Sequence, residues 1–128
     1  MAQRKSVFVE GLDHGDNPIP LGSRIESLFA SGGISGKDVH AGILPESAED
    51  QCRNMFANVR RVMAAAGGTP DDIISMKIYV TSRDVRPVIN EHWVSMFPEE
   101  ATRPARHVLV AELLPRVHLN CEVLAVIS

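Results

Sequence analysis

The feature that most constrains the fold is a change of hydrophobic period between residues 47–66 and residues 73–81. Across 47–66 the apolar residues recur every three or four positions, which is the period of a helix with one buried face. Those positions are Cys52, Met55, Phe56, Val59, Val62, Met63 and Ala66. Across 73–81, apolar residues occupy every second position from Ile74 to Val80, which predicts a strand with one buried face. A helix followed closely by a half-buried strand predicts a layered α+β domain.

The same helix–strand order occurs a second time. Residues 84–97 return to helical spacing, and Pro98 ends the pattern. Short apolar runs predict the remaining strands at residues 7–9, 27–31, 107–113 and 118–127. The expected structure is α+β and forms a single domain over residues 1–128. In it, one mixed β-sheet carries both helices on one face.

The composition fits one globular domain of 128 residues, because 45% of the residues are hydrophobic and 23% are charged. The formal charge of -3 argues against nucleic acid as a partner, since phosphate binding needs a local excess of Lys and Arg. The longest apolar runs, at 62–66 and 123–127, are far too short to cross a bilayer. The polar start at residues 1–5 lacks the apolar region of a secretory signal. We therefore expect a cytoplasmic protein that contacts neither nucleic acid nor membrane.

The cysteine and histidine pattern predicts neither a metal nor a cofactor. Cys52 and Cys121 each occupy an apolar position of a predicted element and lie in no CxxC motif, so we expect buried free thiols. The histidines are His14, His40, His92, His107 and His118. Their spacing matches no metal-binding motif, and no Cys/His grouping follows the usual zinc pattern.

Residues 102–107 have the greatest density of groups suited to ligand binding. Pro104 favours extended geometry at Arg103, and Arg106 then stands at the start of the predicted strand 107–113. A guanidinium is planar and can hold a carboxylate through two parallel hydrogen bonds. The alternative is a surface arginine in an ion pair, which composition alone favours. His107 follows directly, but strand alternation points it and Arg106 to opposite faces.

The last predicted strand carries two polar side chains on one face. Asn120 and Glu122 share that face with His118, and the apolar residues between them occupy the other. Asn120 and Glu122 are about 6.5 Å apart along the strand. A carboxylate in an otherwise apolar strand is either an exposed edge residue or a functional acid. The residues alone leave both interpretations open.

Several short motifs extend along most of the chain. They are Ser31-Gly32-Gly33-Ile34, Gln51, Asn58, Ala65-Ala66-Gly67, Lys77-Ile78-Tyr79-Val80, Asn90, Phe97, Arg103-Pro104-Ala105-Arg106 and Glu122-Val123-Leu124-Ala125-Val126. Over residues 27–126 the chain resembles the RidA/YjgF family, most specifically in the Pro-Ala-Arg element followed by two strands. The resemblance implies a chorismate-mutase-like fold and a homotrimer with three ligand clefts between subunits. It also implies hydrolysis of reactive enamines and imines, such as 2-aminoacrylate, to a keto acid and ammonia.

The same resemblance implies a set of site residues. By position, Arg106 is similar to the arginine that binds the substrate carboxylate, and Ser31 is similar to the serine on the opposing wall of the cleft. Main-chain groups near Gly32 and Val108 would complete the pocket. The chemistry needs no metal, because an imine carbon is already electrophilic. The enzyme has only to hold the carboxylate, supply a proton and place a water molecule.

The chain departs from the deaminase pattern at two places. Asn120 stands where deaminase members of the family carry a glutamate that positions water, and the nearby acid is Glu122. The loop at 17–20 lacks the family's aromatic residue. An amide can orient water but accepts a proton poorly, so the alternative function is a non-catalytic module that binds a small carboxylate metabolite. The ribonuclease activity associated with parts of the family fits the acidic balance poorly.

Overall fold

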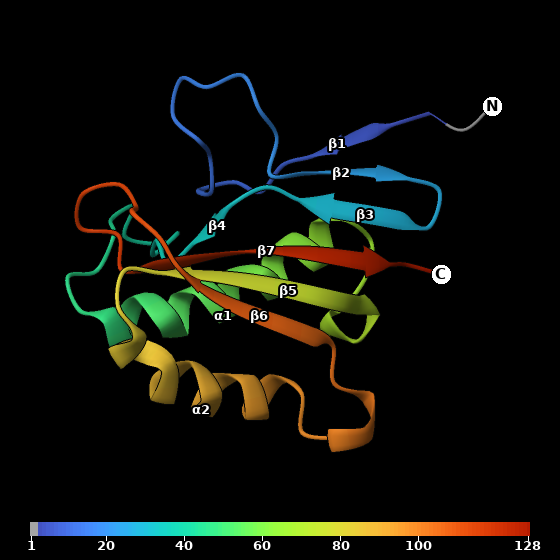
Figure 1. Cartoon of the computed structure of the whole chain (residues 1–128). Helices are drawn as coiled ribbons and strands as arrows, with labels where there is room; N and C mark the ends of the chain where they lie inside the picture. The colour runs from blue at the N-terminus through green and yellow to red at the C-terminus, as the bar shows by residue number, and fades with distance from the viewer. Residues whose placement is uncertain (1–2) are drawn as a thin grey trace.

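In the computed structural model, which describes residues 3–128, two α-helices pack against one mixed sheet (Figure 1). The helices are α1 (Ala48–Ala65) and α2 (Arg86–Met96). Within the described residues the strands are β1 (Lys5–Val7), β2 (Gly22–Ile25), β3 (Leu28–Ser31), β4 (Ile34–Ser35), β5 (Ile73–Val80), β6 (Ala105–Val110) and β7 (Leu119–Val126). They are ordered β1-β2-β3-β7-β5-β6, and β4 also pairs with β7. Only β5 and β6 run parallel among these pairs, which confirms the predicted mixed α+β sheet.

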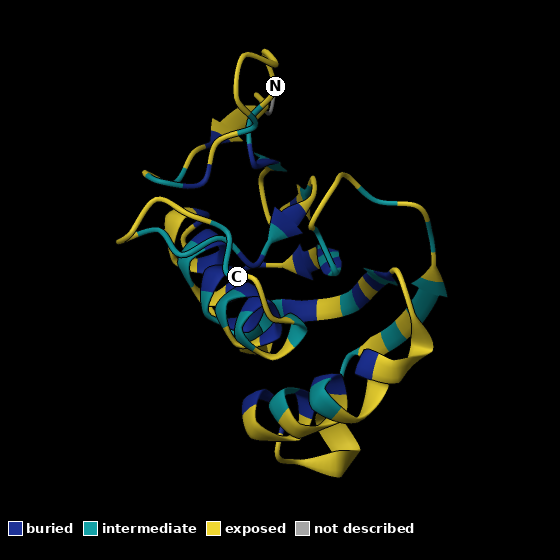
Figure 2. Cartoon of the chain, turned by 90° about the vertical axis from the view of Figure 1, so that its left-hand side faces the viewer, coloured by how far each residue is buried: buried dark blue, intermediate teal, exposed yellow. Residues whose placement is uncertain are grey.

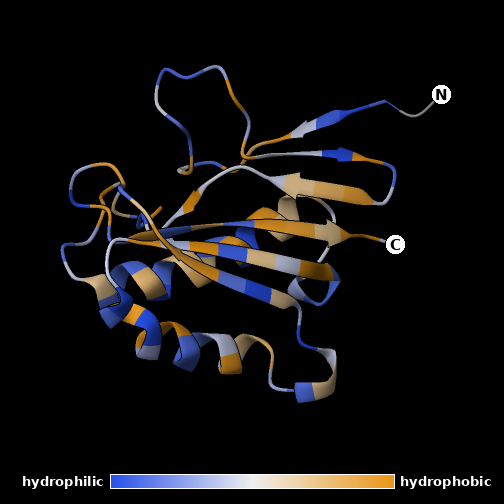
Figure 3. Ribbon diagram, viewed as in Figure 1, coloured by the Kyte–Doolittle hydropathy of each residue, from blue (hydrophilic) through white to orange (hydrophobic). Residues whose placement is uncertain are grey.

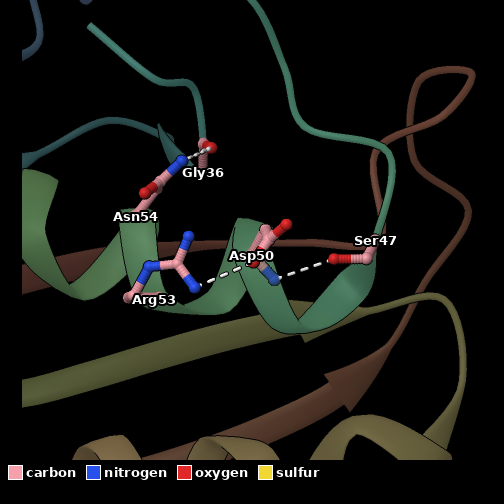
Figure 4. Close-up of polar contacts among 5 residues, drawn as sticks. All are labelled: Gly36, Ser47, Asp50, Arg53 and Asn54. Carbon is pink, nitrogen blue, oxygen red and sulfur yellow. Dashed lines mark hydrogen bonds and ion pairs between the residues drawn. The ribbon is translucent and has the colours of Figure 1, made fainter. Parts of the chain in front are cut away.

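Helix α1 begins at a capped N-terminus (Figure 4). The Ser47 hydroxyl accepts a hydrogen bond from the Asp50 backbone N–H at 3.1 Å, which satisfies one of the free donors of the first turn. Arg53 donates to the Asp50 carboxylate at 2.8 Å. The hydrogen bonds from Arg53 and Ser47 lower the pKa of Asp50. The helix ends before Gly67, whose φ of 90° lies in the left-handed region that suits glycine.

The core lies between the helices and one face of the sheet. Burial alternates along the strands, as Figure 2 shows. In β7 the buried residues are Leu119, Cys121, Val123 and Ala125. Phe56 of α1 stacks on His92 of α2 at 5.7 Å between ring centroids, which joins the two helices. Cys52 and Cys121 are free and buried, as predicted, and burial raises the pKa of Cys52 to about 12.

The opposite face of the sheet carries no helix within residues 3–128, and we call it the open face. Several apolar side chains lie on it, including Leu28, which is 53% exposed, and Val126, which is 46% exposed. Ile25 pairs with Leu28, and Leu28 pairs with Val126, so the three form a row across β2, β3 and β7. Leu124 lies two residues from Val126 on the same face. One chain therefore leaves an apolar surface uncovered.

The strands β2 and β4 are not predicted by the hydrophobic pattern. Strand β2 is mostly hydrophilic, in contrast to β3 (Figure 3). It pairs with β3 over four residue pairs, and Gly22 permits this close approach, since a Cβ there would lie 2.5 Å from the Phe29 ring. Strand β4 has only two residues, which is too few for a period to be recognised.

Several strands begin or end at other residues than predicted, because strand pairing and not the apolar run determines their boundaries. The strand predicted at 7–9 is β1 at Lys5–Val7, and Phe8 is 70% exposed. The strand predicted at 107–113 is β6, which begins at Ala105 where its parallel pairing with Ser75 starts. Arg106 therefore lies inside the strand and not in front of it. Helix α2 begins at Arg86, after a short 3-10 turn.

Candidate active site

The sheet register places Arg106 and Val108 on the face that the helices cover. In the parallel pairing of β5 and β6, Arg106 is opposite Met76 and Val108 is opposite Ile78. Met76 and Ile78 are completely buried beneath the helices. His107 is opposite the exposed Lys77 and points to the open face. The predicted opposition of Arg106 and His107 is thus confirmed.

Asn120 and Glu122 lie on the open face, as the alternation predicts. In the antiparallel pairing of β5 and β7, Asn120 is opposite Tyr79, and Glu122 is opposite Lys77. The Tyr79 hydroxyl donates a hydrogen bond to Glu122 Oε1 at 2.8 Å. That bond to the carboxylate raises the pKa of Tyr79. Glu122 is therefore engaged within its own sheet, whereas Asn120 faces a pocket at the end of the strand.

The Arg106 guanidinium lies over α2. Its Nη2 donates to Asn90 Oδ1 at 2.8 Å, and its central carbon lies 5.1 Å from the centroid of the Trp93 ring. Its Nη1 is buried and has no hydrogen-bond partner within residues 3–128. Burial, followed by the positive charge of Arg86, lowers the pKa of Arg106. The side chain is thus held in place by two contacts, and one of its buried donors has no partner within residues 3–128.

Asn90 and Trp93 are residues to which the sequence assigns no role at the site. They lie three positions apart on α2, so they share one helix face. Trp93 is read from the sequence as an ordinary core position, and it is 8% exposed. Only the crossing of α2 over β6 brings both residues against Arg106. The one sequence signal of this contact is a polar residue, Asn90, three positions before a buried aromatic residue, Trp93.

Ser31 and Gly32 lie where β3 gives way to β4. Ala30 pairs with Leu124 and Ile34 with Cys121, so three residues oppose two and the chain bulges between the strands. The Ser31 hydroxyl accepts from the Val123 backbone N–H at 2.8 Å and donates to the Gly32 carbonyl at 2.8 Å. The Gly32 N–H donates to the Leu21 carbonyl at 2.8 Å. Both residues therefore stabilise the bulge, and their predicted contact with substrate stays a prediction.

A pocket of about 620 Å³ opens at the end of β7 nearest Asn120. Its walls are the loop between β1 and β2, strand β4 with the loop after it, and the loop between β6 and β7. The polar lining residues are Asp13, His14, Asn17, Ser35, Lys37 and Asn120. The apolar lining residues are Leu12, Ile19, Leu21, Leu44, Leu114 and Val117. This pocket can accept a molecule that has both a hydrocarbon part and polar groups.

Two buried amides of α1 hold the walls of this pocket. Gln51 donates to the carbonyls of Pro45 and Arg116 at 2.7 and 2.8 Å, and its Oε1 accepts from the His118 N–H at 2.9 Å. Asn58 donates to the carbonyls of Ser35 and Lys37 at 2.8 and 2.9 Å. Gln51 and Asn58 are completely buried. Polar residues on the buried face of a helix are the sequence signal for such a role.

One chain does not bring all the predicted residues together. Asn120 lines the pocket, whereas Glu122 lies in β7, Ser31 ends β3 and Gly32 lies between β3 and β4. Arg106 and Val108 are on the opposite face from Asn120. Among residues 3–128 no cluster of three or more His, Cys, Asp or Glu side chains has an arrangement that would hold a metal ion. In the same residues no helix has the length and apolar character needed to cross a bilayer.

Comparison with known proteins identifies the family. The family model described as Endoribonuclease L-PSP matches residues 23–127. TdcF of Escherichia coli (strain K12), which is named as a reactive intermediate deaminase, is 34% identical over 123 residues, or 94% of this chain and 87% of TdcF. The 2-iminobutanoate/2-iminopropanoate deaminase of Salmonella typhimurium is 27% identical over 124 residues, or 95% of this chain and 97% of the deaminase.

Solved structures match the fold of this chain. The crystal structure of Escherichia coli TdcF with bound serine matches with a TM-score of 0.86 and 28% identity, covering 97% of this chain and 99% of that structure. A crystal structure of the Escherichia coli YjgF gene product matches with a TM-score of 0.84 and 24% identity, covering 95% and 98% of the two chains. The chain therefore belongs to the RidA/YjgF family, whose family model carries the description Endoribonuclease L-PSP.

Proposed function

We propose that this protein hydrolyses the imine or enamine of a small carboxylic acid, such as 2-aminoacrylate, to a keto acid and ammonia. The observation that carries the proposal is the Arg106 guanidinium, which is fixed by Asn90 and Trp93 and keeps a buried Nη1 without a partner. A carboxylate would satisfy that donor. Relatives named as deaminases of 2-imino acids, and a relative that holds serine, support a small carboxylate ligand.

The proposed site is shared between chains. Arg106 and Asn120 lie on opposite faces of one sheet, so a single chain cannot offer both to one small substrate. A homotrimer would bring the Arg106 and Val108 of one chain to the pocket of the next, beside Ser31, Gly32, Asn120 and Glu122. The apolar row of Ile25, Leu28 and Val126 on the open face supports such an assembly, because its burial would favour association.

The reaction needs no metal in this proposal. The substrate carboxylate binds Arg106, which fixes the imine carbon against a water molecule. Asn120 orients that water through its amide, and Glu122 supplies a carboxylate on the same strand face. The apolar wall of the pocket contacts the hydrocarbon part of the substrate.

The alternative is a non-catalytic module that uses Arg106 to bind a small carboxylate metabolite. Asn120 favours this alternative, since an amide is a poor acceptor for the proton of water. The two functions share the ligand and differ in turnover.

The test is ammonia release from freshly generated 2-aminoacrylate and from longer imino acids, compared with the uncatalysed rate and repeated with a chelator. We expect release above the uncatalysed rate, unchanged by the chelator. Asn120→Glu should increase the rate, and Glu122→Gln should reduce it. If the protein and the Asn120→Glu variant are both silent while the keto acid still binds, the binding module replaces the hydrolase.

Light scattering tests the assembly separately. We expect a mass of about three chains, and we expect Leu124→Glu on the open face to reduce it, because a charge would be buried at the interface. A stable monomer at micromolar concentration would contradict the shared site.

A further inference from the structure

His14 lies in the loop between β1 and β2, which forms one wall of the pocket beside Asn120. Both ends of this wall are anchored, because Leu12 is 4% exposed and Leu21 is 3% exposed. Within the loop, Asp13 Oδ1 accepts from the Gly15 N–H at 2.9 Å, and the His14 carbonyl accepts from the Asn17 N–H at 3.4 Å. These contacts hold the backbone around His14 in a turn on this wall of the pocket.

The imidazole of His14 has an unmet hydrogen-bonding group. Its Nε2 is buried and has no partner within residues 3–128. A buried nitrogen without a partner is unfavourable, so this nitrogen lacks a hydrogen bond that the described residues do not supply. His14 and Asn120 line the same pocket.

The two side chains have complementary chemistry. An amide such as Asn120 can orient water but does not exchange protons near neutral pH. An imidazole is the side chain best suited to accept and return a proton there. The other charged groups of the pocket are Asp13 and Lys37, so His14 has one carboxylate and one ammonium group in its surroundings.

We propose that His14 is the proton-transfer residue of this pocket and performs the step that Asn120 cannot. The inference rests on the proposed hydrolase function. Water held by Asn120 adds to the imine carbon, and its oxygen forms the new C–O bond. His14 accepts a proton from that water, while the π electrons of the C=N bond move to nitrogen. The same proton then passes from His14 to that nitrogen, which gives a neutral carbinolamine.

The second half of the reaction reverses the direction of transfer. The carbinolamine hydroxyl gives its proton to His14 as its oxygen forms the C=O bond. The C–N bond breaks with its electron pair on nitrogen, which takes the proton from His14 and leaves as ammonia. Imine and water are thereby converted to keto acid and ammonia, and His14 returns to its starting state.

The test compares His14→Gln with His40→Gln, a matched control on an exposed loop near Arg61. Steady-state ammonia release from 2-iminobutanoate and calorimetric binding of 2-oxobutanoate are measured for both variants and the unmodified protein across a pH series. We expect His14→Gln to lower kcat by about 10²- to 10⁴-fold and to lose the pH dependence of kcat. Binding of 2-oxobutanoate should change by less than about threefold, because Arg106 holds the carboxylate. His40→Gln should match the unmodified protein.

The outcomes separate this inference from the proposed function. An active protein whose His14→Gln variant keeps its rate and pH profile would overturn the role of His14 and leave the hydrolase standing. An unmodified protein that is silent with every imino acid would overturn both. Where His14→Gln does not fold, NMR of the His14 ring in the unmodified protein decides: its resonances should shift when 2-oxobutanoate binds, and unchanged resonances would overturn the inference.

Discussion

The helix-covered face and the open face of the same sheet differ in how much of their apolar surface one chain buries. On the covered face, Phe29, Met76 and Ile78 are fully buried against the helices. On the open face, Leu28 and Val126 remain about half exposed beside polar side chains. Burial of apolar area is the main favourable term in folding, so the covered face stabilises the fold. The open face leaves the same kind of surface exposed in a single chain.

The candidate site spans this division. Arg106 belongs to the covered face and is fixed by α2, whereas Asn120 belongs to the open face and lines a pocket made of loops. The half of the site that α2 fixes carries the positive charge of Arg106. The half that is built from loops is a pocket with polar side chains. Variants of each half would show how independent the two halves are.

The largest expected effect comes from neighbouring residues of β3 that point to opposite faces. Phe29→Ala should lower the free energy of unfolding by about 3–5 kcal/mol, because it leaves a cavity in the core. Leu28→Ala should change it by no more than about 0.5 kcal/mol in dilute, dissociated protein, since Leu28 is half exposed. Urea unfolding at low protein concentration measures both. Equal losses would contradict the distinction between the two faces.

The next largest effect concerns Arg106, the proposed ligand-binding residue on the covered face. Arg106→Lys keeps the charge but loses the planar fork, so the binding free energy of 2-oxobutanoate should weaken by about 1.5–3 kcal/mol. Calorimetry measures the affinity. Arg103→Lys is the matched control, because Arg103 donates to the Phe97 carbonyl at 2.8 Å and is not assigned to the ligand. Equal affinity in Arg106→Lys and the unmodified protein would count against the assignment.

The covered face could be predicted from the sequence because burial leaves a period in the residue types. The stripe of α1 and the alternation of β7 are confirmed, with Asn120 and Glu122 on the predicted face. The alternation of β5 is confirmed from Met76 to Val80. The predicted burial of Ile74 is wrong, because the register with β7 shifts between Ile73 and Ser75, so that Ile73 is buried and Ile74 is 49% exposed. Each of these elements buries one face, so its apolar residues recur in the sequence with the period of a helix or a strand.

The open face and the pocket could not be predicted in the same way. Strand β4 and the bulge at Ser31 depend on the register between β3 and β7, which no local period records. The position of His14 depends on how a loop of irregular backbone is anchored by Leu12 and Leu21. The separation of Arg106 from Asn120 follows from the pairing of both strands with β5.

A smaller effect tests whether Ser31 belongs to the fold or to the ligand site. Ser31→Ala removes the acceptor for the Val123 N–H, so the free energy of unfolding should fall by roughly 1–2 kcal/mol. Ser31→Thr keeps a hydroxyl and should lose less. Chemical unfolding of both variants makes the measurement. Unchanged stability together with weaker 2-oxobutanoate binding would assign Ser31 to the ligand instead.

The smallest effect is expected on the open face, at the hydrogen bond between Tyr79 and Glu122. This bond needs the tyrosine proton and raises the pKa of Tyr79 above its ordinary value of 10.0. The folded state thus holds that proton more tightly than the unfolded state does. The stabilisation is present in full below pH 10 and is lost as the pH rises through the folded-state pKa.

Tyr79→Phe should remove this contribution, which we expect to be less than about 1 kcal/mol because the pair is partly exposed to solvent. The measurement is the free energy of unfolding in urea at pH 8 and at successive values above pH 10. The difference between the two proteins should shrink as the pH rises, since the unmodified protein loses the bond while the variant has none to lose. A difference that stays constant, or one as large as that of Phe29→Ala, would show that the open face stabilises the single chain as the covered face does.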